Sequence, residues 1–242
     1  MEILTAQKAD IHFWVGFYGD TDCCDWASKK AYLDMNRTMT FPRDDSKDEK
    51  TIKKERQELV DKGTKIIRDR LGCLTEEFDS WHGKTCDRLI ECYGGKLQDR
   101  KTKESTSLTY GQAQKWLNMT LKYLWLLDRV GFIADDDIHQ FIQKNGDLFH
   151  VPLDSYILRY AAKQSKKKKE SFDLDNGLKG FDCKTHWGDF NSTWSQITEA
   201  EKYLEYQQAL RSAIQGKTPL EWELEHWHKA LGYYDHKDTD KS

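Results

Sequence analysis

The segment from Thr109 to Val130 constrains the fold of this chain more than any other. Thr109 and Gln112 have the spacing of a capping box, in which each side chain bonds a backbone amide of the other residue at the start of a helix. Apolar side chains then cover most of the helix surface: Trp116, Leu117, Met119, Leu121, Tyr123, Leu124, Trp125, Leu126 and Leu127. Because a helix that is hydrophobic nearly all round is buried inside a domain, we predict an all-α fold around a central helix at about 109–130.

Further helices are predicted on both sides of this segment, and strand-like alternation occurs only at His12–Tyr18. Capping patterns at Thr198/Glu201 and Thr218/Glu221 begin two of these helices. Before the central segment, a sparse apolar stripe predicts a helix that follows the charged stretch 43–58: Ile52, Leu59, Ile66, Ile67 and Leu71. After it, the predicted helices are 135–144, about 152–165, 198–214 and 219–231. Charged or glycine-containing stretches are predicted to be exposed linkers or loops: 43–58, 94–106 and 166–192. We expect residues 1–242 to form one helical domain.

The composition indicates a folded protein without a strong overall electrostatic field. Aromatic residues make up 12% of the chain and include nine Trp, whereas disordered chains lack such groups. The formal net charge is −3, so no cationic field of the whole protein attracts nucleic acid or anionic lipid. Any binding of nucleic acid is therefore expected to be local.

The sequence also carries expectations about location. Its first residues lack the basic region and apolar run of a secretion signal, and no apolar stretch approaches the length of a membrane span. The six cysteines are scattered, with no Cys-x-x-Cys pair. We therefore expect a soluble, cytoplasmic protein with free thiols and no membrane partner. No pattern favours a particular oligomeric state.

Several familiar catalytic and metal-binding signatures are absent. The chain has no glycine-rich phosphate loop of the Walker or dinucleotide type, no Gly-x-Ser-x-Gly and no His-Glu-x-x-His, and we expect no cofactor. His226 and His228 stand two apart and would face different ways on a helix. Cys183 and His186 have no second pair at a zinc-finger distance. No metal site is predicted.

The central helix carries one polar stripe. At about 100° per residue, its members fall within one narrow sector of the helix: Gly111, Lys115, Asn118, Lys122 and Arg129. Lys115, Asn118 and Lys122 would together suit a phosphate or another anion. Alternatively, the stripe is the helix's one solvent-facing strip, with the lysine stems lying over apolar neighbours.

A second candidate site lies at Val151–Arg159, which reads Val-Pro-Leu-Asp-Ser-Tyr-Ile-Leu-Arg. This segment resembles the Pro/Ala-Val-Asp-Thr-His-Val-x-Arg segment of the helix-hairpin-helix DNA glycosylase superfamily. The resemblance implies that Asp154 is the catalytic carboxylate, near a helix N-terminus and facing an extruded nucleotide, and that Arg159 is the basic residue of the next turn. The alternative is structural, with Pro152 in the first helical position and Asp154 in the third, where a carboxylate complements the helix dipole.

The resemblance covers nine residues and departs from the family elsewhere. The region 129–137 stands where the family has a Leu-Pro-Gly-Val-Gly-type hairpin, and it holds one Gly, no Pro and three acids. No Lys stands where the lyase members keep theirs. The resemblance therefore implies a diverged, glycosylase-like binding or repair protein and gives no support to lyase activity.

Two interpretations of function remain open at this point. In the first, the protein associates with nucleic acid, with Asp154 at the site and phosphates held by Lys115, Asn118 and Lys122 together with Arg159, Lys166 and Lys167. In the second, it is a non-catalytic helical interaction module whose charged runs are solvated. We favour the first because it alone accounts for Asp154 and the stripe together. It requires that Asp154 and the stripe converge in the fold.

Overall fold

Helix α5 (Tyr110–Arg129) follows the predicted capping box and forms the centre of the fold. The computed structural model describes residues 22–72, 76–154, 157, 161 and 194–235, with side chains as far as 227. The hydroxyl oxygen of Thr109 accepts the backbone N–H of Gln112 at 3.1 Å, and the Gln112 side chain accepts that of Thr109 at 3.0 Å. The leucines that were predicted to be buried are buried: Leu117, Leu121, Leu124 and Leu127. The all-α prediction is confirmed.

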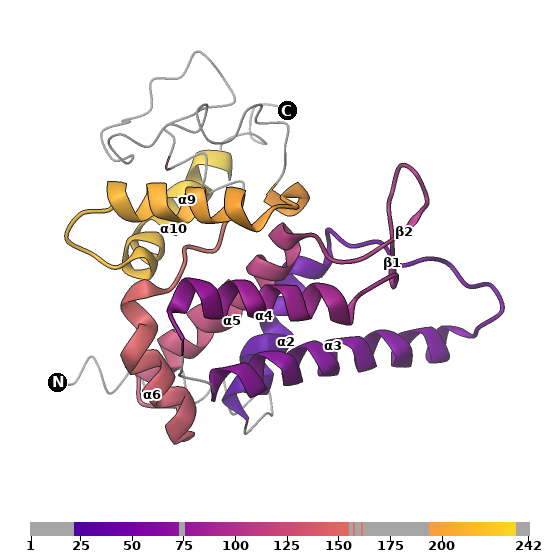
Figure 1. Cartoon of the computed structure of the whole chain (residues 1–242), viewed down its shortest axis with the longest axis horizontal. Helices are drawn as coiled ribbons and strands as arrows, with labels where there is room; N and C mark the ends of the chain where they lie inside the picture. Colours follow the sequence, from indigo (N-terminus) through magenta and orange to yellow (C-terminus); the bar gives the residue numbers. More distant parts are fainter. Residues whose placement is uncertain (1–21, 73–75, 155–156, 158–160, 162–193, 236–242) are drawn as a thin grey trace, which may run out of the picture.

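The other helices pack around α5, so that it is covered on several sides. α2 (Cys23–Asn36) makes the most extensive contact with it, and α4 (Phe78–Cys92) contacts both it and α3 (Glu49–Leu71). α6 (Asp136–Asn145) continues into a short 3₁₀ helix, η1 (Gly146–Leu148). Figure 1 shows α9 (Ala200–Ala213) and α10 (Pro219–Asp235) on the opposite side of the molecule from α3. In the described part of the chain, no helix is long and apolar enough to cross a membrane.

Part of the stretch predicted to be a linker is helical. The segment 43–58 is exposed as expected, but α3 begins at Glu49 and so takes in its second half. Asp48 is the N-cap, and its carboxylate accepts the backbone N–H of Thr51 at 2.7 Å. The prediction was wrong here because Lys and Glu favour helices, so a charged run after a good N-cap continues as an exposed helix.

The predicted loop 94–106 contains a short hairpin. β1 (Leu97–Gln98) pairs antiparallel with β2 (Ser105–Thr106), and Leu97 is buried. Asp99 shapes the connection, since its carboxylate accepts the backbone N–H groups of Lys101 and Thr102. The hairpin projects from one end of the helical body (Figure 1). The candidate strand His12–Tyr18 lies outside the described residues.

The two predicted C-terminal caps have different outcomes. At α10, Thr218 and Glu221 exchange the backbone-to-side-chain hydrogen bonds of a capping box, as predicted. At α9 the cap predicted at Thr198 is wrong. The helix begins at Ala200, and its N-cap is Glu199. The residues before it form a 3₁₀ helix, η3 (Trp194–Gln196), and the carbonyl of Ile197 accepts the N–H of Gly111 at 2.8 Å. The residues just before α9 therefore contact the start of α5.

Candidate functional site

Most of the polar stripe of α5 faces the protein interior, and only Arg129 at its end is exposed, where it pairs with Glu221. Lys115, Asn118 and Lys122 are all buried, so the alternative of a solvent-facing strip is wrong for these three residues. Buried ammonium groups require charged or hydrogen-bonding partners because they have lost their water. Each of the three side chains has such a partner on another segment of the chain.

Lys115 pairs with Asp154, so the two candidate features of the sequence meet. The Lys115 Nζ lies 3.0 Å from Asp154 Oδ2, and the two side chains are only 7% and 15% exposed. The same ammonium lies 5.9 Å from the centre of the Trp194 ring, within the range of a cation–π contact. The other carboxylate oxygen of Asp154 accepts the backbone N–H of Ile157 at 2.9 Å. Asp154 therefore joins the middle of α5 to the start of the following helical segment.

The local role of Asp154 differs from the structural alternative set out above. That alternative placed Pro152 in the first helical position and Asp154 in the third. Residues 151–154 are not helical, whereas Ile157 is. A carboxylate that accepts the N–H three residues ahead is an N-cap. Asp154 thus stands before the helical segment, and Pro152 lies buried in the non-helical stretch that precedes it.

Lys122 forms a second buried ion pair, with Glu223 of α10. Its Nζ lies 2.5 Å from Glu223 Oε2. Burial raises the pKa of Glu223, while the Lys122 ammonium acts in the opposite direction. The charges of Lys115 and Asp154 also act on the Glu223 pKa, so the two pairs form one electrostatic cluster. Residues 122 and 223 lie far apart in the sequence, and no spacing pattern pointed to their contact.

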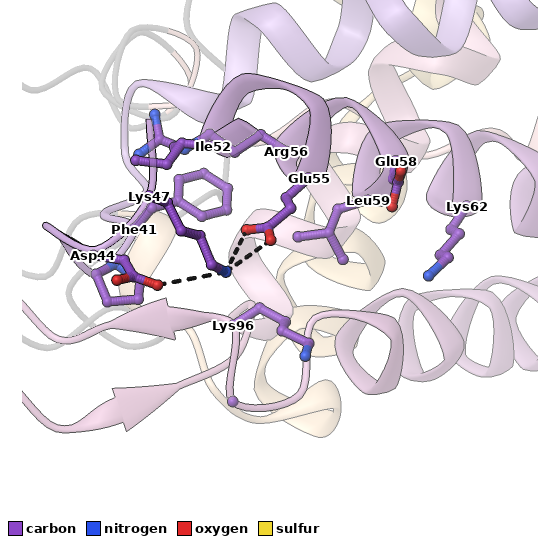
Figure 2. A pocket seen from close by; sticks show the side chains of 12 residues that line it. Phe41, Asp44, Lys47, Ile52, Glu55, Arg56, Glu58, Leu59, Lys62 and Lys96 are labelled. Carbon is purple, nitrogen blue, oxygen red and sulfur yellow. Dashed lines mark hydrogen bonds and ion pairs between the residues drawn. The ribbon is translucent and has the colours of Figure 1, made fainter. Parts of the chain in front are cut away.

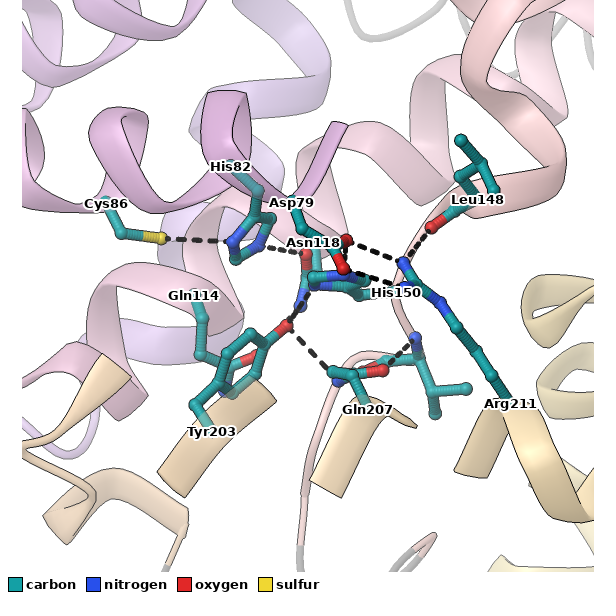
Figure 3. A network of polar contacts seen from close by, with 11 residues as sticks. Asp79, His82, Cys86, Gln114, Asn118, Leu148, His150, Tyr203, Gln207 and Arg211 are labelled. Atoms are coloured by element: carbon teal, nitrogen blue, oxygen red, sulfur yellow. Dashed lines mark hydrogen bonds and ion pairs between the residues drawn. The ribbon is translucent and has the colours of Figure 1, made fainter. Parts of the chain in front are cut away.

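Asn118 lies in a chain of buried polar side chains instead of at an open anion site (Figure 3). Its side-chain oxygen lies 2.8 Å from His82 Nε2, and its amide nitrogen donates to the Tyr203 hydroxyl at 2.7 Å. Tyr203 Oη lies 2.7 Å from His150 Nδ1, and His150 Nε2 lies 2.9 Å from Asp79 Oδ1. This polar chain joins α4, α5, the segment before Asp154, and α9.

The geometry of the polar chain fixes its proton positions. Burial lowers the pKa of both His82 and His150, that of His150 to about 4, so both rings are neutral near pH 7 and each carries one N–H. His150 Nε2–H donates to Asp79, which leaves Nδ1 to accept the Tyr203 O–H. His82 Nε2–H likewise donates to the Asn118 oxygen. The bonds that link His82, Asn118, Tyr203 and His150 then run in one direction, toward the carboxylate of Asp79.

Arg211 closes the outer end of the polar chain. Its two terminal nitrogens donate to the two carboxylate oxygens of Asp79 at 2.8 and 2.9 Å, and it also donates to the carbonyl of Leu148. This paired geometry is the strongest arrangement available to an arginine and a carboxylate. Sequence reasoning did not select Asp79, His82, His150 or Arg211, because their spacing matches no local motif.

Cys86, His82 and Asn118 have the residue types of a cysteine-hydrolase triad, but their surroundings indicate a structural role. The Cys86 sulfur lies 3.8 Å from His82 Nδ1. Burial raises the pKa of the Cys86 thiol well above its ordinary value, so the thiol stays protonated. A nucleophilic cysteine must be a thiolate with access to substrate, and both Cys86 and His82 are fully buried. Among the described cysteines, Cys23, Cys24 and Cys92 are also free thiols.

The remaining candidate residues divide into those outside the described part and those held locally. Arg159, Lys166 and Lys167 lie outside the described residues, as do Cys183 and His186. Across the described ranges, no group of three or more His, Cys, Asp or Glu side chains is arranged to hold a metal ion. The His226 ring instead bonds the carbonyl of Trp222 at 2.7 Å through Nδ1.

Two surface cavities lie near the hairpin. The first, which we call the α3 cavity, has a volume of about 400 Å³ and lies between α3 and the turn that precedes β1 (Figure 2). At the wall of this cavity, Lys47 forms ion pairs with both Asp44 and Glu55. The second, which we call the hairpin cavity, has a volume of about 500 Å³. It lies between the segment after α2, the β1–β2 hairpin and the start of α5.

The candidate site is thus a cluster of two buried ion pairs beside the polar chain. Comparison with known proteins adds no relative, since no family model, curated protein or solved structure matches the chain. The chemistry therefore follows from the side chains themselves. A carboxylate at a helix start, held by an ammonium that also contacts an indole ring, can stabilise positive charge or hold a polar ligand.

Proposed function

We propose that this protein binds nucleic acid and carries a glycosylase-like site centred on Asp154 and Lys115. One observation supports the proposal above all others, the 3.0 Å contact between Lys115 Nζ and Asp154 Oδ2. Two segments selected from the sequence for separate reasons meet there. The convergence of Asp154 with the α5 stripe was the condition that the nucleic-acid interpretation set.

The proposed chemistry follows from the resemblance at Val151–Arg159. A carboxylate that faces an extruded nucleotide stabilises the positive charge that develops on the sugar as the base departs. Asp154 is a group of the required negative charge, and it lies at the required place, the start of a helical segment. Lys115 orients this carboxylate through the 3.0 Å contact, and we propose that its ammonium also meets a phosphate when substrate enters.

We assign Lys122 to the fold and not to the proposed site. Its partner Glu223 is more deeply buried than Asp154, and the distance is shorter, 2.5 Å against 3.0 Å. Asn118 is likewise committed to the polar chain. The proposal therefore retains Asp154 and Lys115 from the described candidates. A cytoplasmic location belongs to the same proposal, because it fits the free thiols and the presence of nucleic acid.

Binding of the full chain to labelled single- and double-stranded DNA and RNA, measured from low to high salt, tests the proposal. Affinity should fall as salt rises, because neutralised phosphates release counterions. Lys115→Met should weaken binding. Asp154→Asn should leave affinity equal or higher, since it removes a negative charge, and should abolish release of free base from oligonucleotides that carry damaged or mismatched bases.

Lys122→Met is the matched control, since it breaks the other buried pair of the same cluster. If it weakens binding as much as Lys115→Met does in folded protein, the effect belongs to the fold and the proposed site is wrong. If the wild type binds no nucleic acid at low salt, the proposal fails. The second candidate, a helical interaction module, then takes its place. One observation favours that candidate, because Leu33 of α2 is 61% exposed beside a cavity between α2 and α3.

A further inference from the structure

The hairpin cavity gathers positive charge, and among the described residues no carboxylate forms an ion pair with its cations. Arg37 contributes from the end of α2, and Arg100 and Lys101 contribute from the hairpin. The guanidinium of Arg100 is positioned by two neutral acceptors, the Thr40 hydroxyl at 2.8 Å and the Arg37 carbonyl at 3.2 Å. Neutral acceptors orient a guanidinium but leave its charge available to an anion.

The single carboxylate that lines the hairpin cavity is already engaged. Asp99 Oδ1 accepts the backbone N–H groups of Lys101 and Thr102 at 2.8 and 2.7 Å, and these bonds lower the pKa of Asp99. They fix the turn that presents Arg100 and Lys101. The lining of the cavity therefore contains three cationic side chains and one carboxylate. That carboxylate accepts hydrogen bonds from backbone N–H groups.

Neutral donors and a helix start complete the surroundings of the cations. Hydroxyl and amide side chains line the cavity, including Thr106, Ser107 and Gln196. The cavity also borders Thr109 and Gln112 at the start of α5, a 20-residue helix whose N-terminal end carries partial positive charge. Hydroxyl, amide and guanidinium donors around one space are the groups that hold phosphate oxygens in proteins.

The neighbouring α3 cavity has a smaller excess of positive charge. Figure 2 shows the Lys47 ammonium between Asp44 and Glu55, which neutralise it within the protein. Its Arg56 lies over the ring of Phe41. The two cavities are lined by neighbouring residues of the same segments, 37–42 and 95–101. The hairpin cavity has three cationic side chains and one carboxylate, whereas the α3 cavity has four cationic side chains and three carboxylates.

We propose that the hairpin cavity is a phosphate-binding site, with Arg37, Arg100 and Lys101 as its cations, and that the phosphate is that of a nucleic-acid backbone. The second part rests on the proposed function, and the first does not. The site would hold a strand by its backbone, independently of base sequence, while Asp154 and Lys115 act elsewhere on α5 and its neighbours.

The double variant Arg37→Ala/Lys101→Ala tests the site, because both side chains are exposed and their removal leaves the Asp99 turn intact. Lys50→Ala/Lys54→Ala is the matched control, with the same change of net charge on the exposed face of α3. The full chain is measured in two ways. One is binding of labelled DNA and RNA against salt, and the other is thermal stability in pyrophosphate against sodium chloride of equal ionic strength.

The cavity variant should bind nucleic acid at least about tenfold more weakly than the control at low salt. Its slope of log affinity against log salt should be smaller by roughly 0.7–0.9 for each phosphate that the variant no longer neutralises. Pyrophosphate should stabilise the wild type and the control but not the cavity variant.

The outcomes separate this inference from the proposed function. Nucleic-acid binding that is equal in the two double variants overturns the cavity as the backbone site and leaves the proposed function standing. Stabilisation by pyrophosphate through the cavity, without nucleic-acid binding, supports the phosphate site while the proposed function fails. Absence of both effects overturns both.

Discussion

The ammonium group of Lys122 lies 2.5 Å from the carboxylate of Glu223, with both side chains buried between α5 and α10. Such a pair is expensive to assemble because both ions lose their water, and it is far more damaging to break because the remaining ion has no partner. The pair therefore ties the C-terminal helix to the centre of the fold.

We expect Lys122→Met to destabilise the protein by about 3–5 kcal/mol, since it leaves the Glu223 carboxylate buried without its cation. Urea unfolding measures the change. The double variant Lys122→Met/Glu223→Leu should recover most of the stability, because no buried charge remains. Lys47→Met, which breaks the exposed pair with Glu55, is the control and should destabilise the protein far less, because water screens exposed charges. A destabilisation in Lys122→Met no larger than in this control would contradict the buried pair.

Stability should fall as the pH falls from 6.5 to about 4, because of the buried histidines. Burial lowers the pKa of His150 from 6.5 to about 4, although the bond to Asp79 opposes the shift. In this window the unfolded imidazole takes up a proton that the folded one refuses, so acid favours unfolding. His150 alone should account for about 3 kcal/mol, at 1.36 kcal/mol for each pKa unit. His82 acts in the same direction.

Asp79 does not offset this trend. Burial raises its pKa, but the hydrogen bonds from His150 and Arg211 outweigh burial and hold the pKa well below the ordinary 3.8. Its stabilising contribution is therefore present above pH 3.8 and disappears only as the pH falls further. Chemical unfolding at several pH values checks the prediction, with His150→Gln as the comparison. The variant should show a shallower dependence between pH 6.5 and 4, and equal slopes would contradict the assignment to His150.

Gly63→Ala should be destabilising although the position lies inside α3. Alanine favours a helix over glycine by about 1 kcal/mol. A Cβ at Gly63, however, would stand 2.1 Å from the ring of Trp116 on α5, and Trp116 is fully buried. Overpacking of this kind costs typically about 1–3 kcal/mol or more, so the clash should outweigh the helix propensity.

Gly72→Ala is the control for this prediction. Gly72 ends α3 with a φ of −73°, and a Cβ there meets nothing closer than 4.0 Å. We expect a neutral change or a gain of up to about 1 kcal/mol, because alanine restricts the unfolded chain. Thermal unfolding of the two variants gives the comparison. A Gly63→Ala protein as stable as Gly72→Ala would mean that α3 does not pack on Trp116 as described.

The sequence by itself determined the central helix and its boundaries. Thr109 and Gln112 cap each other across three residues, and the leucines after them repeat at helical spacing. Both signals are local, so they can be recognised without knowledge of the fold. The same holds for the Thr218/Glu221 box of α10. Thr198 shows the limit of local signals, because the residue type and spacing suit a cap there but Glu199 is the N-cap of α9.

Only the tertiary structure decided the role of the polar stripe. The sequence placed Lys115, Asn118 and Lys122 on one face of a helix, and that pattern suits solvent and an anion equally well. The partners that turn the stripe inward come from distant segments, Asp154 for Lys115 and Glu223 for Lys122. The cations of the hairpin cavity likewise meet because Arg100 bonds Thr40 across the fold. Contacts between residues so far apart depend on how the helices pack, which no local spacing encodes.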